Sequence, residues 1–414
     1  MERLKYVPAL WIYSSMDRRD TVFLDSSMGG GRSYIGLMPH RVFLPGESDA
    51  VEVLDGMSDD DVLMGYLSYD YGLFLHGISS IHPKTQIPDF ILADFDVVIE
   101  EDPVGKRLHV TCRGRVMPVC DEERFVMRLV EGASPPEDIP GHGYDVVSDM
   151  SRSDVVRSVE EARSMMAEGE FYVINLSRSI SVRSSSDPFG TFLRLRRLSP
   201  SPFGAYADLC GIQIASSSME MLLDHRDGVV RTRPIKGTSP RTGDSKKDRD
   251  SLSALLSSDK DRSELLMVTD MERNDMNRFC VPGSVDVGSF FRPEVYSTLY
   301  HTVSDVVGRV REGVRTGEMV SCMFPGGSVT GAPKEVCMEA IDSLEACRRG
   351  IYTGSMGIFS AHMTEMSITI RTMVHSGDTY TIGVGSGITY ESDPDAEYDE
   401  TSLKALAMLR SLEG

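Results

Sequence analysis

The chain has 414 residues, 41% of them hydrophobic, so it can bury a large core and is expected to fold as an ordinary globular protein. Its formal net charge of -20 and the lack of a long Lys/Arg cluster argue against nucleic acid or an anionic membrane surface as a partner, because both require a positive field. A small anionic substrate is compatible with this charge, since local cations or a metal ion can outweigh a distant field screened over roughly 10 Å.

Cysteine usage and hydropathy indicate the compartment. Seven cysteines are scattered without a CxxC pair or zinc-ligand spacing, which is typical of reduced thiols. Residues 1–20 lack a sustained apolar segment, and no run of about 18 apolar residues occurs anywhere. We therefore expect a cytoplasmic protein that makes no contact with membranes.

In chain order, the first predicted elements are short strands at 96–100 and 108–116, separated by Gly and Asp turns. A stretch rich in Pro and Gly follows at 131–144 and is typical of a surface connection. These features divide the chain into an N-terminal region (1–130), a connection (131–145) and a C-terminal region (146–414).

The C-terminal region mixes helical and strand patterns. Residues 151–167 have helical periodicity, and 171–182 read as a strand. Residues 366–374 and 379–389, joined by a turn at 375–378, predict an antiparallel hairpin. A closing helix is predicted at 395–412. The fold class expected from these elements contains both α and β structure.

Two helices carry acidic faces. Asp261 and Glu264 are three residues apart, which places both carboxylates on one helix face, and Glu397, Glu400 and Lys404 share one stripe of the closing helix. If the two faces converge, they could hold Mg²⁺ through one or two carboxylates. For each helix alone, the simpler interpretation is that early acids and late bases complement the helix dipole.

Two turns carry candidate chemistry. The glycine-rich segment 324–334 enters a helix with Pro333 near its first turn and could face an anion, but Ala332 follows Gly331 where a phosphate-binding loop needs Lys. A structural turn is the alternative. Lys236 directly precedes Gly237 at the end of a strand, a setting that can favour the neutral amine a nucleophile needs. An ordinary solvated lysine is the alternative there.

The C-terminal region contains these motifs in a fixed order: PIKGT, DKDRSELLMVTDMERND, VYSTLYHTVSDVVG, FPGGSVTGAPK, RRGIYTGSMG, SITIRT, GVGSGITYESDP and EYDET. Together they resemble the chorismate-binding enzyme family, from about residue 160 to the C-terminus. The resemblance implies an α+β fold in which two large, roughly orthogonal antiparallel β-sheets form a sandwich flanked by helices. The active site is expected between the sheets, with strands from residues 1–130 contributing to the same sandwich.

The resemblance also implies roles for individual residues. Glu264 and Glu400 match Mg²⁺ ligands, while Asp261 and Glu397 match neighbouring acids that hold metal-bound water or the reacting groups. His301 matches an active-site histidine that acts as a general acid or base. The implied substrate contacts are Thr238, Tyr352, Arg371, Gly385, Gly387 and Lys404.

The residue at position 236 bears on the product. Anthranilate synthases carry Ala there, and ammonia adds directly to ring carbon 2, whereas Lys236 matches a lysine nucleophile of aminodeoxychorismate synthases. Asn175, where anthranilate synthases usually have Val, agrees with the second group. We therefore expect Mg²⁺-dependent amination of chorismate to 4-amino-4-deoxychorismate on the 4-aminobenzoate branch, with anthranilate synthase of tryptophan biosynthesis as the alternative. Isochorismate and salicylate synthases fit less well, because they carry Lys at the position of Val173 and a Glu acid at that of Arg233.

Two further expectations concern regulation and partners. Residues 23–27 only partly resemble the tryptophan-binding motif of regulated anthranilate synthases, so whether tryptophan binds stays open; the candidate regulatory pocket comprises Asp25, Ser26, Pro200 and Ser201. The chain has no glutaminase triad signature, which implies a separate glutamine amidotransferase subunit that supplies ammonia. A regulatory protein that binds chorismate or tryptophan without turnover is a third alternative, against which the presence of Glu264, His301 and Glu400 argues.

Overall fold

The computed structural model describes residues 4–28, 30–296 and 299–414. Its helices are α1 (Ala9–Ser14), α2 (Ala50–Asp55), α3 (Tyr69–Leu75), α4 (Val119–Gly132), α5 (Arg152–Glu168), α6 (Pro188–Leu198), α7 (Ser245–Leu256), α8 (Asp259–Asn277), α9 (Thr316–Met323), α10 (Lys334–Leu344) and α11 (Pro394–Arg410). Its strands are β1 (Thr21–Asp25), β2 (Ser33–Phe43), β3 (Val62–Leu67), β4 (Phe90–Asp102), β5 (Arg107–Cys112), β6 (Asp145–Ser148), β7 (Val173–Arg183), β8 (Phe203–Leu209), β9 (Ile212–Ser218), β10 (Met221–Arg226), β11 (Val229–Arg233), β12 (Ile235–Pro240), β13 (Asp286–Val295), β14 (Leu299–Arg309), β15 (Gly331–Ala332), β16 (Ser355–Ser360), β17 (Met363–Ile368), β18 (Thr372–Ser376) and β19 (Thr379–Ile388).

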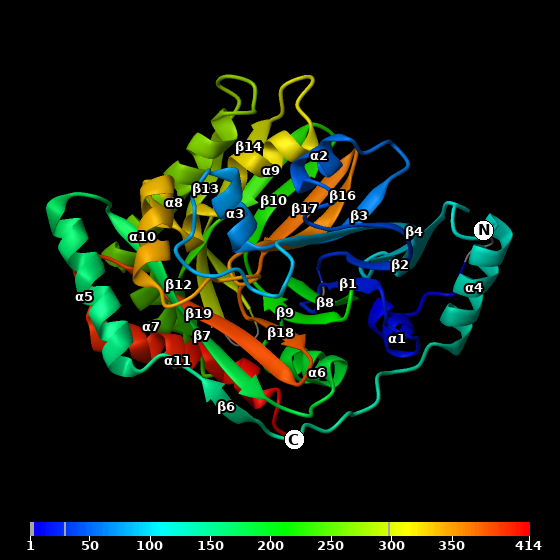
Figure 1. Cartoon of the computed structure of the whole chain (residues 1–414), viewed down its shortest axis with the longest axis horizontal. Helices are drawn as coiled ribbons and strands as arrows, with labels where there is room; N and C mark the ends of the chain where they lie inside the picture. The colour runs from blue at the N-terminus through cyan, green and yellow to red at the C-terminus, as the bar shows by residue number, and fades with distance from the viewer. Residues whose placement is uncertain (1–3, 29, 297–298) are drawn as a thin grey trace.

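The strands confirm the expected α+β class with a large antiparallel sheet (Figure 1). Hydrogen bonds link them in one continuous order, in which two halves can be distinguished. The first half-sheet runs β13, β14, β11 with β12, β10, β17, β16, β3 and β4 with β5. The second half-sheet runs β2, β1, β8, β9, β18, β19 and β7 with β6 and β15. The β2–β4 pairing joins them, so the two expected sheets are connected rather than separate.

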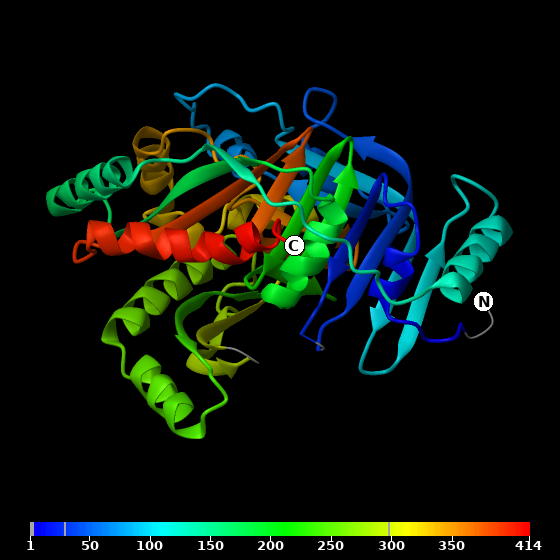
Figure 2. The ribbon, with the colours of Figure 1, turned by 90° about the horizontal axis from the view of Figure 1, so that it is seen from below.

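Helices cover the outer face of each half-sheet. Helices α6, α5 and α11 pack on β9, β7 and β19, while α7 and α8 pack on β12 and β14 of the first half-sheet. Figure 1 shows α6 and α11 along the lower side and α9 and α2 along the upper side, and Figure 2 shows α11 alongside the half-sheet that it covers. On β19 the even-numbered residues Tyr380, Ile382 and Val384 enter the core beneath these helices. The odd-numbered glycines of β19 therefore face the space between the half-sheets.

Local signals placed several of these elements correctly. Helix α5 confirms the prediction at 151–167, because Ser151 caps its first turn and Gly169 ends it in a left-handed conformation. Helix α11 begins at Pro394 behind the cap residue Asp393, close to the predicted start. The predicted hairpin is confirmed by the antiparallel pair β18 and β19, but the predicted bounds of its first strand, 366–374, were wrong, since the chain is broken at 369–371 into β17 and β18. The break exists because the chain crosses there from the first half-sheet to the second.

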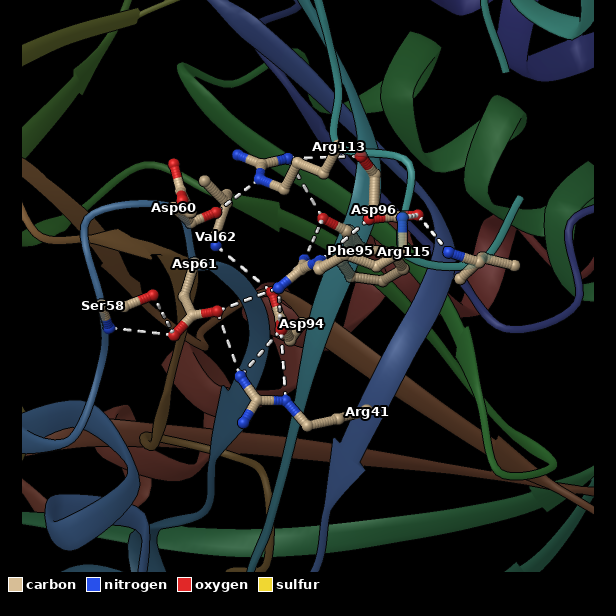
Figure 3. A network of polar contacts seen from close by, with 11 residues as sticks. Arg41, Ser58, Asp60, Asp61, Val62, Asp94, Phe95, Asp96, Arg113 and Arg115 are labelled. Carbon is tan, nitrogen blue, oxygen red and sulfur yellow. Dashed lines mark hydrogen bonds and ion pairs between the residues drawn. The ribbon is translucent and has the colours of Figure 1, made fainter. Parts of the chain in front are cut away.

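A polar network fastens the N-terminal strands (Figure 3). Arg115 contacts Asp94 and Asp96, which are fully buried on β4, and also Asp61; Arg41 bridges Asp61 and Asp94. Burial alone would raise the pKa of Asp96, but hydrogen bonds from Glu122, from main-chain N–H groups and from Arg115 outweigh it and lower that pKa to about 2. The network therefore ties β2, β4 and the start of α4 together.

The segment 133–144 is irregular, and β6 pairs with the end of β7 directly after it. Among the described helices, none combines the length and the apolar content needed to cross a bilayer.

Candidate active site

The candidate site lies where the chain crosses between the half-sheets. Glu220 stands on the crossing from β9 to β10, and Arg371 on the crossing from β17 to β18. These crossings are hydrogen-bonded to each other, because Ile368 N–H donates to the Glu220 carbonyl at 3.0 Å and the Ser218 hydroxyl donates to the Ile368 carbonyl at 2.5 Å. The crossings therefore hold a buried acid and a cation in a fixed relation.

Lys236 lies on β12, which pairs with β14 through a bulge at Gly237. Gly237 has φ +66°, and a Cβ there would meet Thr302 Oγ1 at 2.8 Å and Asp261 Cγ at 3.1 Å. A side chain at this position would be both strained and obstructed, which explains the glycine after the lysine. The lysine amine reaches the other half-sheet, since its Nζ is 3.6 Å from the point where a Cβ on Gly387 would lie.

His301 is buried on β14, opposite Thr238 in register. Its Nδ1 is 2.9 Å from Thr238 Oγ1 and 3.4 Å from the Gly237 carbonyl, which can only accept, so Nδ1 carries the ring proton. Burial lowers the pKa of His301 to about 4, so the ring is neutral near pH 7. Nε2 has a free lone pair and no hydrogen-bond partner in the described part of the chain, an arrangement that suits a base or acceptor better than an acid.

The predicted acids come from α8 and α11. Glu264 Oε1 and Glu397 Oε2 are buried oxygens without hydrogen-bond partners among residues 4–28, 30–296 and 299–414. Burial raises the pKa of Glu264. The positive charges of Lys236 and Lys260 act against this rise, and the negative charges of Asp261 and Glu397 add to it. Unsatisfied carboxylate oxygens of this kind fit a hard divalent cation. However, within the described residues no three His, Cys, Asp or Glu side chains are grouped closely enough to hold a metal as they stand.

Glu400, the other predicted metal ligand, is ion-paired. Lys404 Nζ lies 2.7 Å from its carboxylate and donates to the Gly385 carbonyl at 2.8 Å. Burial alone would raise the pKa of Glu400, but the charge and hydrogen bond of Lys404 outweigh it and lower that pKa. Lys404 is therefore engaged with Glu400 and the β19 main chain.

Arg371 supplies a cation without an assigned anion. It has φ +52°, and burial lowers the pKa of its guanidinium. Among the described residues it forms no ion pair within 4.0 Å, whereas the buried Arg349 is fully engaged with Glu345. A partly buried guanidinium without a counter-ion is suited to binding a substrate carboxylate.

The glycines of β19 form a flat face beneath Tyr352. A Cβ on Gly383 would lie 2.0 Å from the Tyr352 ring, and one on Gly385 would lie 2.9 Å from its hydroxyl. The motif GVGSG thus places glycine at every second position of one strand face, which allows aromatic or ligand atoms to approach the backbone. Beyond Tyr352 the same face continues into a hydroxyl-lined cleft; its lining includes Ser177, Ser179, Thr379, Thr381, Tyr352 and Gly383.

Glu220 is the functional candidate that the sequence reasoning missed. Its side chain is buried, and its Oε1 has no hydrogen-bond partner within the described residues. Burial raises the pKa of this carboxyl, while a hydrogen bond with Ser328 and the positive charge of Lys236 act to lower it. A buried carboxyl whose pKa is raised in this way is a candidate general acid. The sequence could have indicated Glu220, because it is the only charged residue between Ile212 and Leu223.

Glu220 changes one argument made from the sequence. Arg233 stands where isochorismate and salicylate synthases are expected to carry a glutamate acid, and it is ion-paired with Glu294 and Asp305. Val173 stands where they are expected to carry a lysine, and it is buried and apolar. The lack of an acid at Arg233 does not separate amination from isochorismate chemistry, because Glu220 supplies a buried carboxyl to the site. The apolar residue at Val173 remains the distinguishing feature.

The residues of the candidate regulatory pocket lie together at the end of β1. The buried Asp25 accepts from Arg196 Nε at 2.7 Å. The segments containing Ser26 and Pro200 are joined by Ser27, whose hydroxyl donates to the Ser201 carbonyl at 2.9 Å. That this region binds tryptophan stays a prediction.

Comparisons with known proteins agree with this architecture. The family model for chorismate binding enzymes matches residues 43–410, and the chain belongs to that family. It is 32% identical to an anthranilate synthase component 1 of Haloarcula marismortui, over 96% of this chain and 86% of the relative. It is also 32% identical to the aminodeoxychorismate synthase component 1 of Bacillus subtilis, over 84% of this chain and 75% of the relative.

Solved structures show the same fold. The anthranilate synthase component I of Streptococcus pneumoniae superposes with a TM-score of 0.83 at 24% identity and covers 99% of this chain and 100% of its own. The menaquinone-specific isochorismate synthase of Escherichia coli gives a TM-score of 0.78 at 17% identity, covering 98% of this chain and 92% of its own. The chain is therefore a chorismate-utilising enzyme of the aminodeoxychorismate or anthranilate synthase type, whose relatives bear both names.

Proposed function

We propose that this enzyme aminates chorismate to 4-amino-4-deoxychorismate, with water as the other product. The observation that carries the proposal is the position of Lys236, whose amine lies against the open glycine face at Gly387. In an anthranilate synthase of this type, alanine at that position would leave the same space free for ammonia. A lysine amine there can instead act as the first nucleophile.

In the proposed mechanism the Lys236 amine forms a bond to ring carbon 2, and the ring double bonds shift to expel the hydroxyl from carbon 4. Glu220, whose pKa is raised by burial, donates a proton to that hydroxyl so that it leaves as water. Ammonia then bonds to carbon 4, the double bonds shift back, and the lysine amine leaves carbon 2. His301, neutral with a free Nε2, accepts the proton that the bound ammonia loses.

Other residues of the site bind the substrate. We assign the ring carboxylate or ring to Arg371 and Tyr352, and the enolpyruvyl carboxylate to Lys404, which would exchange part of its pairing with Glu400 for the substrate. Glu264 and Glu400 would hold Mg²⁺, assisted by Asp261 and Glu397. When bound, the metal would supply positive charge that orients the carboxylate of chorismate.

Ammonia is proposed to come from a separate glutamine amidotransferase. Relatives named component 1 imply a second component in those enzymes. Ammonium salts should replace the partner at alkaline pH, where more free ammonia is present.

The second candidate is anthranilate synthase, favoured by the relative that matches 96% of this chain. Product analysis separates the two. The protein is incubated with chorismate, Mg²⁺ and an ammonium salt, and products are followed by mass and by anthranilate fluorescence. Aminodeoxychorismate without pyruvate, together with loss of most activity in Lys236→Ala, supports the proposal. Anthranilate with an equal amount of pyruvate would overturn it.

A further inference from the structure

We propose that Asn175 orients the incoming ammonia through its side-chain carbonyl and so helps to select the nucleophile; this inference rests on the proposed amination. Asn175 lies on β7 directly opposite Gly387 in the antiparallel register. Side chains of such a pair point to the same face, with Cβ positions about 5 Å apart. The Asn175 amide therefore faces the same space as the Lys236 amine, which lies 3.6 Å from the Gly387 Cβ position.

The amide oxygen is buried and unsatisfied. Oδ1 of Asn175 has no hydrogen-bond partner in the described part of the chain, and it lies 3.0 Å from the point that a Cβ on Gly385 would occupy. The Tyr352 hydroxyl lies 2.9 Å from that same point. A buried acceptor without a donor is destabilising unless the working enzyme supplies one. The missing donor must reach the gap between Tyr352 and Lys236, where the reacting ring binds.

The main chain holds this amide in place. Asn175 N–H donates to the Thr330 carbonyl at 2.8 Å, and Arg349 Nη2 donates to the Asn175 carbonyl at 2.6 Å. Arg349 is itself fixed by the buried Glu345. These two bonds fix the main chain of Asn175, so that only rotation of its own side chain can move the amide. Such rigidity is expected of a positioning group and is not needed in a surface asparagine.

The chemistry of a carbonyl acceptor selects the ligand. An amide oxygen accepts from N–H or O–H and repels a carboxylate, so it does not suit the two carboxylates of the substrate. The C4 hydroxyl of chorismate is also a donor, but it leaves as water before ammonia bonds in the proposed mechanism. Ammonia offers three N–H donors and must reach carbon 4, which is separated by one ring carbon from the atom bonded to Lys236. A hydrogen bond from ammonia to Oδ1 leaves its lone pair free to point at the ring. Valine, which the family resemblance implies at this position in anthranilate synthases, offers no such acceptor.

The test compares Asn175→Val with Asn175→Asp in the full chain, with ammonium chloride as the nitrogen source. Initial rates are measured against free ammonia and against chorismate separately. Loss of one hydrogen bond predicts that Asn175→Val raises KM for ammonia by about 3- to 10-fold. KM for chorismate should stay within about twofold, and Asn175→Asp, which keeps an oxygen at this position, should restore KM for ammonia to within about threefold of the original enzyme. Ser181→Ala, six residues along the same strand face and outside the lining of the cleft, is the matched control and should change neither constant.

The outcomes are distinct. If Asn175→Val changes neither KM, or raises both equally, Asn175 does not orient ammonia although the amination stands. If the unaltered enzyme makes no aminated product from chorismate and ammonium, the proposed function itself fails, and this inference with it. If Asn175→Val does not fold, Asn175→Ser, which shortens the side chain but keeps it polar, is measured in the same way and must also raise KM for ammonia selectively.

Discussion

The buried ion pair between Arg349 and Glu345 offers a quantitative test of how the site is supported. The side chains are 1% and 5% exposed, and their closest approach is 2.6 Å. Arg349 Nη1 also donates to the Val329 carbonyl at 2.8 Å, and the guanidinium lies 4.6 Å from the centre of the Tyr69 ring. Arg349→Met keeps the aliphatic volume and removes all of these polar contacts at once.

The expected loss in the free energy of unfolding depends on the polar groups that stay buried after Arg349 is replaced. In Arg349→Met the Glu345 carboxylate would keep only the Ser177 N–H donor at 2.7 Å, while the Val329 and Asn175 carbonyls would lose their partner. Removing one member of a buried pair typically lowers the free energy of unfolding by about 3–5 kcal/mol. The matched control is Arg152→Met, which removes an exposed arginine paired with Asp395 and Asp399 and should cost about 0–1 kcal/mol.

Urea unfolding followed by far-UV circular dichroism and by a second probe measures both changes, provided that the two transitions coincide. A double variant that also carries Glu345→Leu should recover part of the loss, because no unpaired charge is then left buried. A loss below about 1 kcal/mol in Arg349→Met, or no difference from Arg152→Met, would refute the argument that this pair holds β7 and Asn175 in place.

Three further predictions follow from the acids. With free ammonia held constant, kcat should fall as pH rises through the raised pKa of Glu220, because the acid form is lost; Glu220→Gln should remove this dependence and lower kcat by about 10²–10⁴-fold, measured in a pH series with chorismate in excess. Glu264→Gln should raise the Mg²⁺ concentration needed for half-maximal activity at least about tenfold without lowering the urea midpoint, and an unchanged metal requirement would remove Glu264 from the proposed site. Since the pKa of Asp96 is lowered to about 2, its stabilising effect is present at neutral pH and is lost as pH falls from about 4 towards 2; Asp96→Asn should therefore destabilise the protein at pH 7 but not near pH 2, as urea unfolding at both pH values would show.

Local sequence signals were enough for many elements but not for their connections. The caps Ser151 and Asp393 place α5 and α11 within a residue or two, because a capping side chain acts on its own first turn. The break between β17 and β18 was missed, since both flanking runs are apolar and hydropathy does not record which half-sheet a strand joins. The joining of the two sheets through β2 and β4 likewise depends on pairings between distant segments.

The site residues divide in the same way. Those within ordered motifs, such as Lys236 and His301, were found by resemblance, and the structure places them on paired strands β12 and β14. The unpaired oxygens of Glu264 and Glu397 could not be predicted, because burial and missing partners are properties of the packed molecule. Glu220 was missed for a further reason, since an isolated acid on the short connection between β9 and β10 has no motif of its own.

The crossings explain why the reacting groups depend on one another. Glu220 and Arg371 stand on separate segments that pass between the half-sheets, and the Ile368 and Ser218 hydrogen bonds join those segments. Lys236 extends from the first half-sheet, whereas the glycine face that its amine approaches belongs to the second. A shift of one half-sheet against the other would thus alter the distance from the amine to the ring while leaving each half-sheet internally intact. Catalysis that relies on such positioning loses much of its rate for displacements of about 1 Å. The buried polar contacts at the crossings are therefore best understood as fixing the relative position of the half-sheets, which the apolar core alone would leave less sharply defined.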